Sequence, residues 1–149
     1  MTRRGEPVID APQRLEAIAN GLSIGGVQRH IFLCAGQSKP RCATREESDL
    51  VWRHLKRRCK DEGLATAPPL WSRNPRLEAQ QESPGDGLLL RNKVDCLRVC
   101  EQGPIAVVYP EGVWYRGVTT EVLDMIIEQH LVGGRIVEEY AFATGSLEK

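Results

Sequence analysis

The 149-residue sequence lacks any uninterrupted apolar run close to the roughly 20 residues that a membrane-spanning helix needs. It also lacks net charge, because 20 Lys and Arg residues balance 20 Asp and Glu residues. Its overall charge therefore attracts neither nucleic acid nor anionic lipid. Arg3 and Arg4 are not followed by the apolar segment of a secretory signal. We expect a cytoplasmic protein that binds no membrane and no nucleic acid.

Several motifs of catalysis are missing as well. There is no G-x-G-x-x-G after a predicted strand, no P-loop, and no Ser, His and Asp spacing that singles out a catalytic triad. The three histidines, His30, His54 and His130, are expected to have structural roles. We therefore do not expect an enzyme. The five cysteines are not expected to form disulfides in a reducing compartment, which makes metal or redox chemistry the leading interpretation.

The hydrophobic pattern predicts one globular α/β domain behind an N-terminal extension at residues 1–28. The extension is expected to contain one short amphipathic helix with an apolar stripe formed by Leu15, Ile18, Ala19 and Leu22. Short apolar runs predict strands at 30–34, 88–94, 105–109 and 113–116. The last two strands are separated by Pro110-Glu111-Gly112, which suits an antiparallel hairpin.

Two longer helices are also expected. The first begins at Thr44, where Glu47 completes a capping box, and ends at Gly63. The second begins at Thr119 or Thr120 and ends at Gly133-Gly134, with one apolar face formed by Val122, Leu123, Ile126, Ile127, His130 and Leu131.

The segment 65–87 contains four prolines and is expected to be a surface loop or mobile insertion without regular structure. The order strand, helix, strand, hairpin, helix indicates a mixed β-sheet flanked by helices.

Four of the five cysteines form two pairs at the ends of predicted strands. Seven residues separate Cys34 from Cys42, and three separate Cys96 from Cys100. Two such loops can each present two thiolates to one 2Fe-2S cluster while their backbone N–H groups face its sulfides. The reversible one-electron change of the cluster would then be the activity.

Two other cysteine chemistries, a zinc site and a redox-active dithiol, compete with the cluster. A four-cysteine zinc scaffold stays open on spacing alone, although zinc sites usually have tight C-x2-4-C knuckles in both halves. A thioredoxin-type dithiol requires C-x-x-C, which the sequence lacks. Cys59 continues the apolar stripe of Val51 and Leu55 and is expected to be a core thiol.

Longer stretches of the sequence resemble a known family. The segment CLRVCEQGPIAVVYPEGVWY at 96–115 resembles the second half-site and hairpin of the thioredoxin-like 2Fe-2S ferredoxins. HIFLC at 30–34 and KPRC at 39–42 are similar to the first half-site, and HLVGGRIVEEY at 130–140 to the final segment. The resemblance covers residues 29–64 and 88–143, and leaves the extension and the proline-rich segment without a counterpart.

The resemblance implies a thioredoxin-like domain at 29–143, with the insertion 65–87 inside it and a tail at 144–149. It implies that Cys34, Cys42, Cys96 and Cys100 bind a 2Fe-2S cluster. It also implies a ferredoxin that exchanges electrons with redox partner proteins, a homodimer, and a cis peptide before Pro104. The alternative is a 2Fe-2S subunit or relay module of a larger complex, similar to those of NADH dehydrogenase or hydrogenases.

Overall fold

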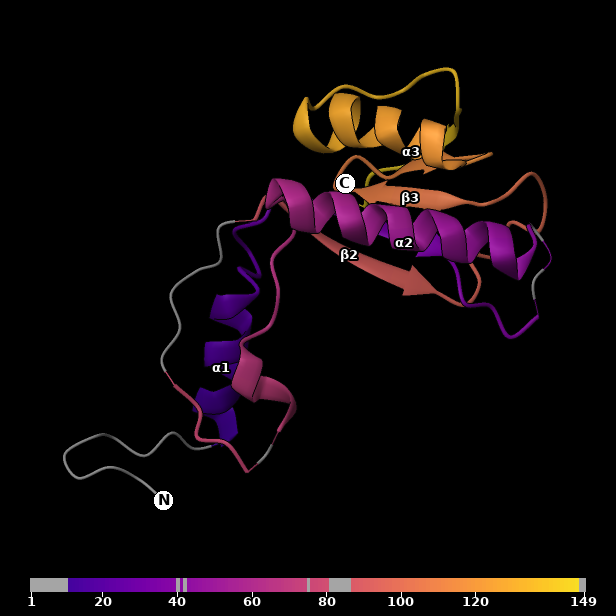
Figure 1. Cartoon of the computed structure of the whole chain (residues 1–149). Coiled ribbons are helices and arrows are strands. Elements are labelled where there is room, and N and C mark those ends of the chain that lie inside the picture. Colours follow the sequence, from indigo (N-terminus) through magenta and orange to yellow (C-terminus); the bar gives the residue numbers. More distant parts are fainter. Residues whose placement is uncertain (1–10, 40, 42, 75, 81–86, 148–149) are drawn as a thin grey trace, which may run out of the picture.

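The computed structural model describes residues 11–39, 41, 43–74, 76–80 and 87–147 (Figure 1). Its helices and strands, in chain order, are α1 (Ala11–Gly21), β1 (Arg29–Cys34), α2 (Arg45–Glu62), the 3-10 helix η1 (Leu70–Arg73), β2 (Leu89–Val94), β3 (Ala106–Tyr109), β4 (Val113–Tyr115), α3 (Thr120–Met125), the π-helix η2 (Ile126–Val132) and β5 (Ala141–Thr144). Within these residues, no helix combines the length and the apolar character needed to cross a bilayer.

The strands form one five-stranded sheet in the order β2-β1-β3-β4-β5. β1 and β2 are parallel, whereas the other neighbouring pairs are antiparallel. A parallel pair requires a long crossover connection, and α2 with the segment that follows it supplies this connection. The expected mixed sheet and the β3–β4 hairpin are both confirmed.

The α2 helix forms as the sequence predicts. The Thr44 side chain accepts a hydrogen bond from the backbone N–H of Glu47, and the Glu47 side chain accepts one from the backbone N–H of Thr44. The helix ends at Gly63, which adopts a φ of 62° that favours glycine. Its buried face consists of Ser48, Val51, Trp52, Leu55 and Cys59.

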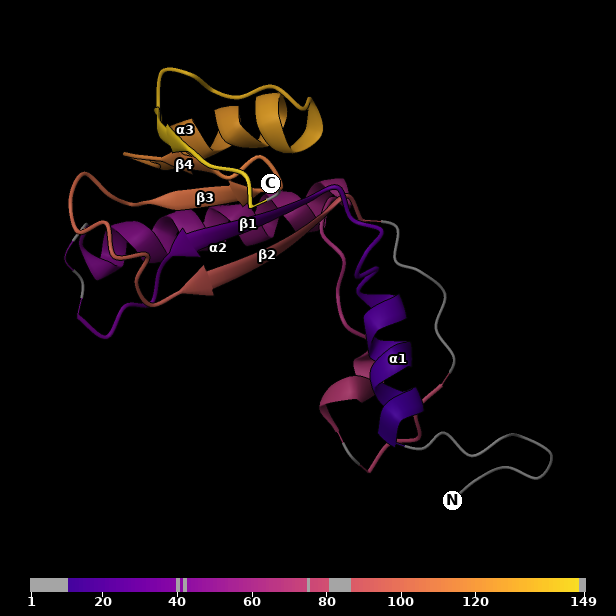
Figure 2. The same cartoon turned by 180° about the vertical axis from the view of Figure 1, so that it is seen from behind.

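Helices α2 and α3 lie side by side over one face of the sheet (Figure 1). Asp124 on α3 joins them, because its Oδ1 lies 2.7 Å from His54 Nε2 and accepts a 3.0 Å hydrogen bond from Arg58. The opposite face, visible in Figure 2, is not covered by α2. On that face the half-buried His30 and Phe32 rings stack at 4.1 Å, and Tyr109 meets Phe32 edge-on at 6.4 Å.

The last helix begins at its predicted cap, Thr119, whose side chain accepts a hydrogen bond from Val122 N. Its second half differs from expectation, since residues 126–132 form a π-helix. The i→i+5 pattern places residues four and five apart on one face. All six residues of the predicted apolar face are therefore buried.

The extension and the insertion contact each other. Arg14 on α1 lies 4.8 Å from the ring centroid of Trp71 in η1, and its guanidinium donates a 3.0 Å hydrogen bond to the Leu77 carbonyl. In Figure 1 this pair projects from one end of the sheet.

One sequence prediction was wrong in this region. The proline-rich segment does contain a regular turn, η1, which follows Pro69 because proline fixes the backbone angle at the start of a helical turn. The predicted α1 helix is present, but its apolar stripe is only partly covered, since Leu15 is 68% exposed and Ala17 is the buried residue of this helix. The reason is that α1 packs on the small η1 turn, which offers too little surface to cover a full stripe.

Candidate metal centre

The parallel pairing of β1 and β2 brings two distant loops to one edge of the sheet. Cys34 ends β1 and pairs in register with Val94, the last residue of β2. Carboxyl ends of parallel strands lie at the same edge, so the loop after β1 and the loop containing Cys96 and Cys100 begin next to each other. Backbone hydrogen bonds from Ala35 N to Val94 O and from Cys34 N to Ile105 O, each 3.0 Å long, hold this edge together.

Three of the four predicted ligands line one small hollow. Cys34 is buried, whereas Cys96 and Cys100 are exposed. The remaining lining residues are Gln37, Lys39, Arg41, Asp95 and Val99. The fourth predicted ligand, Cys42, lies outside the described residues. Among the described residues, no three His, Cys, Asp or Glu side chains form a group that could hold a single metal ion.

Backbone N–H groups contact the sulfur atoms of this hollow. Leu97 N donates a 3.2 Å hydrogen bond to Cys34 Sγ, and Arg98 N donates a 3.1 Å hydrogen bond to Cys96 Sγ. Arg98 reaches this position with a φ of 67°, which is unusual for a residue other than glycine. Backbone N–H donors of this kind also stabilise the sulfur atoms of thiolates that bind an iron–sulfur cluster.

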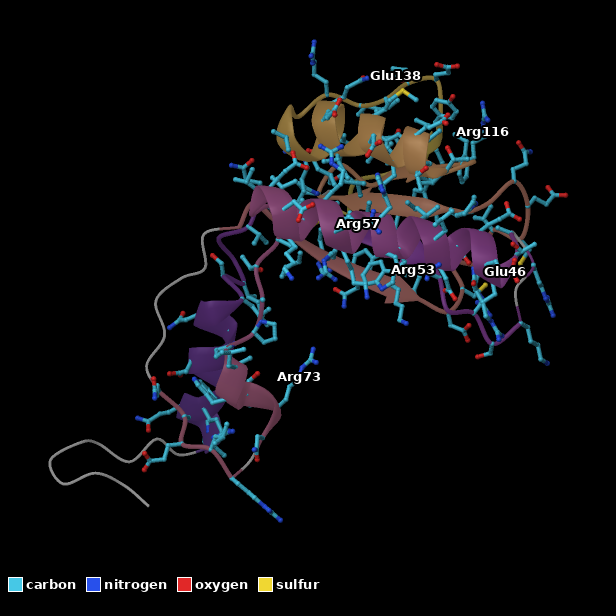
Figure 3. All side chains as sticks on the ribbon, in the orientation of Figure 1. Glu46, Arg53, Arg57, Arg73, Arg116 and Glu138 are labelled. Atoms are coloured by element: carbon cyan, nitrogen blue, oxygen red, sulfur yellow. The ribbon has the colours of Figure 1, made fainter. Side chains whose placement is uncertain are left out.

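The loop after β1 is held by the first turns of α2, whose start is marked by Glu46 in Figure 3. Arg45 donates a 2.6 Å hydrogen bond to the Gln37 carbonyl, and Gly36 N donates a 3.0 Å hydrogen bond to Asp49 Oδ1. Ser38 connects the two loops directly, because its hydroxyl donates a 3.0 Å hydrogen bond to Asp95 Oδ2. These hydrogen bonds hold the loop after β1 against α2 and against the loop that follows β2.

The loop before β3 carries the cis peptide that the resemblance implied, at Gly103-Pro104. It is anchored at two points, because Gly117 N donates a 2.7 Å hydrogen bond to Gln102 O and Val118 N donates a 2.9 Å hydrogen bond to Pro104 O. The loop that carries Cys96 and Cys100 is thus tied to the segment between β4 and α3.

The chemistry of the lining fits an anionic iron–sulfur cluster. Gln37 is only 3% exposed and its Nε2 has no hydrogen-bond partner in the described part of the chain. Its Oε1 accepts a 2.8 Å hydrogen bond from the Ser48 hydroxyl, so the Nε2 donor stays unused in a residue that lines the hollow. The lining also contains two cations, Lys39 and Arg41, against one carboxylate, Asp95. Thiols, unused N–H donors and excess positive charge are what such a cluster requires.

Cys59 is not part of this hollow. It is buried on α2, where removal from water raises the pKa of its thiol although Arg91 opposes this effect. A buried thiol with a raised pKa is a poor metal ligand and a poor nucleophile. The expected role as a core thiol agrees with its burial.

A second polar cluster lies in the core near Arg29, the first residue of β1, and the sequence interpretation missed it. His130 is fully buried, with Nδ1 at 2.8 Å from the Tyr115 hydroxyl and Nε2 at 2.8 Å from Glu111 Oε1. Burial lowers the pKa of His130 although Glu111 opposes this effect. Arg29 forms an ion pair with Glu111 at 3.2 Å. The only sequence signal was a histidine on an apolar helix face, which does not reveal its partner.

No family model matches the chain. Among curated proteins it is 49% identical over 47 residues to "Ferredoxin, 2Fe-2S" of Clostridium pasteurianum, covering 32% of this chain and 46% of that protein. It is 48% identical over 50 residues to "Ferredoxin, 2Fe-2S" of Aquifex aeolicus (strain VF5), covering 34% of this chain and 45% of that protein. The chain thus spans about half the length of these relatives. A "Putative 2Fe-2S ferredoxin" of Priestia megaterium is 26% identical over 117 residues, covering 78% of this chain and 72% of that protein.

Solved structures show the same likeness over most of the chain. A thioredoxin-like [2Fe-2S] ferredoxin from Aquifex aeolicus matches with a TM-score of 0.57 at 24% identity, covering 80% of this chain and 94% of that one. A structure of the wild-type thioredoxin-like [2Fe-2S] ferredoxin from Aquifex aeolicus matches with a TM-score of 0.55 at 25% identity, covering 78% of this chain and 98% of that one. The chain therefore has the thioredoxin-like fold, and its predicted similarity to the thioredoxin-like 2Fe-2S ferredoxins is confirmed.

Proposed function

We propose that this protein is a one-electron carrier that binds a single 2Fe-2S cluster through Cys34, Cys42, Cys96 and Cys100. The observation that carries the proposal is the convergence of Cys34, Cys96 and Cys100 on one hollow at the carboxyl ends of β1 and β2. The names of the curated relatives support the cluster type. The role is that of a ferredoxin and not of an enzyme.

A 2Fe-2S cluster would supply reversible one-electron chemistry. The residues of this chain control how readily the electron is accepted, because reduction adds negative charge to an already anionic group. The N–H groups of Leu97 and Arg98 stabilise negative sulfur, and Lys39 and Arg41 offset negative charge in the hollow. Each of these groups favours the reduced state.

The direct test is spectroscopy of the purified chain together with iron and sulfide analysis. We expect visible charge-transfer bands that bleach with dithionite, and a paramagnetic signal from the reduced protein. Equal amounts of iron and sulfide should be present. A colourless protein that contains zinc and does not react with dithionite would refute the proposal and support the four-cysteine zinc scaffold.

We further propose that the partners are redox proteins and that the chain forms a homodimer. Support for the dimer comes from the half-buried aromatic residues His30, Phe32 and Tyr109 on the sheet face opposite α2. Light scattering should give twice the chain mass, and Phe32→Glu should give the monomer mass. Sizing from native lysate separates a free carrier, which runs as a small dimer, from a subunit, which runs with large partners.

We propose a domain at residues 29–143 to which the extension 1–28 and the insertion 65–87 are appended. The contact between α1 and η1 supports treating the two as one appendage. A cytoplasmic location is also proposed, and the free thiols of Cys59, Cys96 and Cys100 agree with a reducing compartment. Fractionation of cells into cytoplasm, membrane and secreted material tests the location.

A further inference from the structure

Buried side-chain polar atoms without a hydrogen-bond partner are rare in folded proteins and need an explanation. In the part of the chain that the structure describes, these atoms are Gln37 Nε2, Thr66 Oγ1 and Arg91 Nε. The first belongs to the cysteine hollow. The other two belong to residues that line a separate open cleft, which shares no residue with that hollow.

The cleft lies between the second half of α2 and β2, the edge strand of the sheet. The chain that follows α2 forms its border, because Ala65 pairs in parallel with Leu89 and Thr66 N donates a 3.1 Å hydrogen bond to Leu89 O. Its empty space measures about 1040 Å³ when open solvent is included. A single small ion would occupy only part of this space.

Positive charge dominates the cleft. Its lining contains no acidic residue but four cations: Lys56, Arg57, Lys60 and Arg91. No ion pair joins any of the four to another described residue. The neighbouring Arg58, by contrast, forms ion pairs with both Glu62 and Asp124.

These four positive side chains repel one another. Lys60 follows Lys56 by four residues and Arg57 by three, spacings at which side chains of one helix are neighbours and like charges repel. Two carboxylates close to this part of α2, Glu62 and Asp124, form ion pairs with Arg58. An anion in the cleft would relieve this repulsion.

Arg91 is already placed for such an anion. Its guanidinium lies 5.3 Å from the ring centroid of Trp52, a cation–π contact that restricts its motion. The planar guanidinium group suits phosphate oxygens, and its Nε has a hydrogen to donate. The Thr66 hydroxyl, whose Oγ1 is also without a hydrogen-bond partner in the described part of the chain, is a second donor in the lining of the cleft.

We propose that this cleft binds an anion that carries two or more phosphate groups. Arg91 and Thr66 donate hydrogen bonds to one phosphate, and Lys56, Arg57 and Lys60 attract the additional charge. The size of the cleft and the four cations favour several phosphates over one. This site is independent of the cluster, because no lining residue is shared with the cysteine hollow.

The test is calorimetric titration of the purified full-length chain with pyrophosphate at constant ionic strength. We expect saturable 1:1 binding that is weakened about tenfold, or about 1.4 kcal/mol, by Arg91→Gln or Lys60→Gln. Thr66→Val should also weaken binding, although it changes no charge. Arg53→Gln is the matched control, because Arg53 is exposed on the same helix and does not line the cleft (Figure 3).

Three results would overturn the proposal. The first is the absence of saturable binding by pyrophosphate. The second is an equal loss of affinity in Arg53→Gln and Arg91→Gln, which would mean that the anion responds only to overall charge. The third is equal affinity for orthophosphate and pyrophosphate, because we expect orthophosphate to bind more weakly. If Arg91→Gln does not fold, Thr66→Val and Lys60→Gln provide the same comparison.

Discussion

The backbone N–H of Leu97 donates a 3.2 Å hydrogen bond to Cys34 Sγ across 63 positions of sequence. This contact exists because β1 and β2 are adjacent, parallel and in register at Cys34 and Val94. Antiparallel pairing would place the two cysteine loops at opposite ends of the strands. The topology of the sheet therefore creates the site, and we expect the hollow to form before any cluster is inserted.

Cys100→Ser should lose the cluster, whereas Cys59→Ser should retain it. The first change removes a proposed ligand at the hollow, and the second replaces a buried thiol on α2 that lies outside the hollow. We expect iron content to fall to near zero in Cys100→Ser. Cys59→Ser should keep its iron and lose about 1 kcal/mol in the free energy of unfolding, because the buried site exchanges a thiol for a more polar hydroxyl. Full iron occupancy in Cys100→Ser would contradict the ligand assignment.

Gln37→Leu should lower the reduction potential. The substitution removes an unused amide donor from the lining of the hollow, and such a donor would stabilise the extra negative charge of the reduced state. At a fixed solution potential we expect the ratio of reduced to oxidised protein to be about tenfold smaller. This corresponds to a reduction potential lower by about 59 mV for a one-electron couple. Gln37→Glu should lower the potential further. Redox titration followed by visible absorption measures the shift.

Gln129→Leu is the control for the Gln37 variants, because Gln129 is exposed on η2 and does not line the hollow. Its potential should equal that of the wild type. An unchanged potential in both Gln37→Leu and Gln37→Glu would show that the amide does not reach the cluster.

Thr44→Ala should destabilise the fold by about 1 kcal/mol, because it removes the side chain that caps α2. Urea unfolding measures this loss. Thr144→Ala, at an exposed position of β5, should change the free energy of unfolding by much less. A comparable effect of both substitutions would mean that the capping box contributes little.

Acidification should destabilise the protein partly through His130. Burial lowers its pKa in the folded state, so the unfolded chain takes up a proton first as the pH falls below the ordinary histidine pKa of about 6.5. Stability should therefore decrease from that pH downward. Glu111 adds a further loss of stability at lower pH. Its burial raises the pKa of its carboxyl, but hydrogen bonds from Arg29 and His130 outweigh this and hold that pKa below its usual value.

The His130 contribution can be isolated with His130→Gln, which cannot be protonated. This variant should be less stable at neutral pH, yet its free energy of unfolding should change less as the pH is lowered from 7 to well below the ordinary histidine pKa of about 6.5. Denaturant unfolding at each pH measures the difference. Parallel curves for the variant and the wild type would mean that His130 does not titrate on unfolding.

Local signals in the sequence predicted most of the framework. The capping box at Thr44 and Glu47, the apolar runs and the hairpin turn each depend on residues close together in sequence, and the structure has them all. The pairing of the cysteine loops was also expected, because both follow strand-like runs. That Cys42 lies close to the other three cysteines stays a prediction.

Features that depend on distant contacts were not predictable in the same way. The contact of His130 with Glu111 and Tyr115 requires knowing which strand faces the last helix. The unused Nε2 of Gln37 depends on Ser48 holding the other end of the amide. The exposed side of α1 depends on a partner, η1, that lies more than fifty residues further along the chain.

The contact between Arg14 and Trp71 has a consequence for how the chain can be shortened. Deleting the first 28 residues would uncover Trp71, which is now 7% exposed, and deleting 65–87 would remove the contacts that Arg14 of α1 makes with Trp71 and Leu77. Either truncation alone would expose apolar surface and favour aggregation. A minimal version of this protein should therefore lack both segments together, and proteins of this type should gain or lose them as a pair.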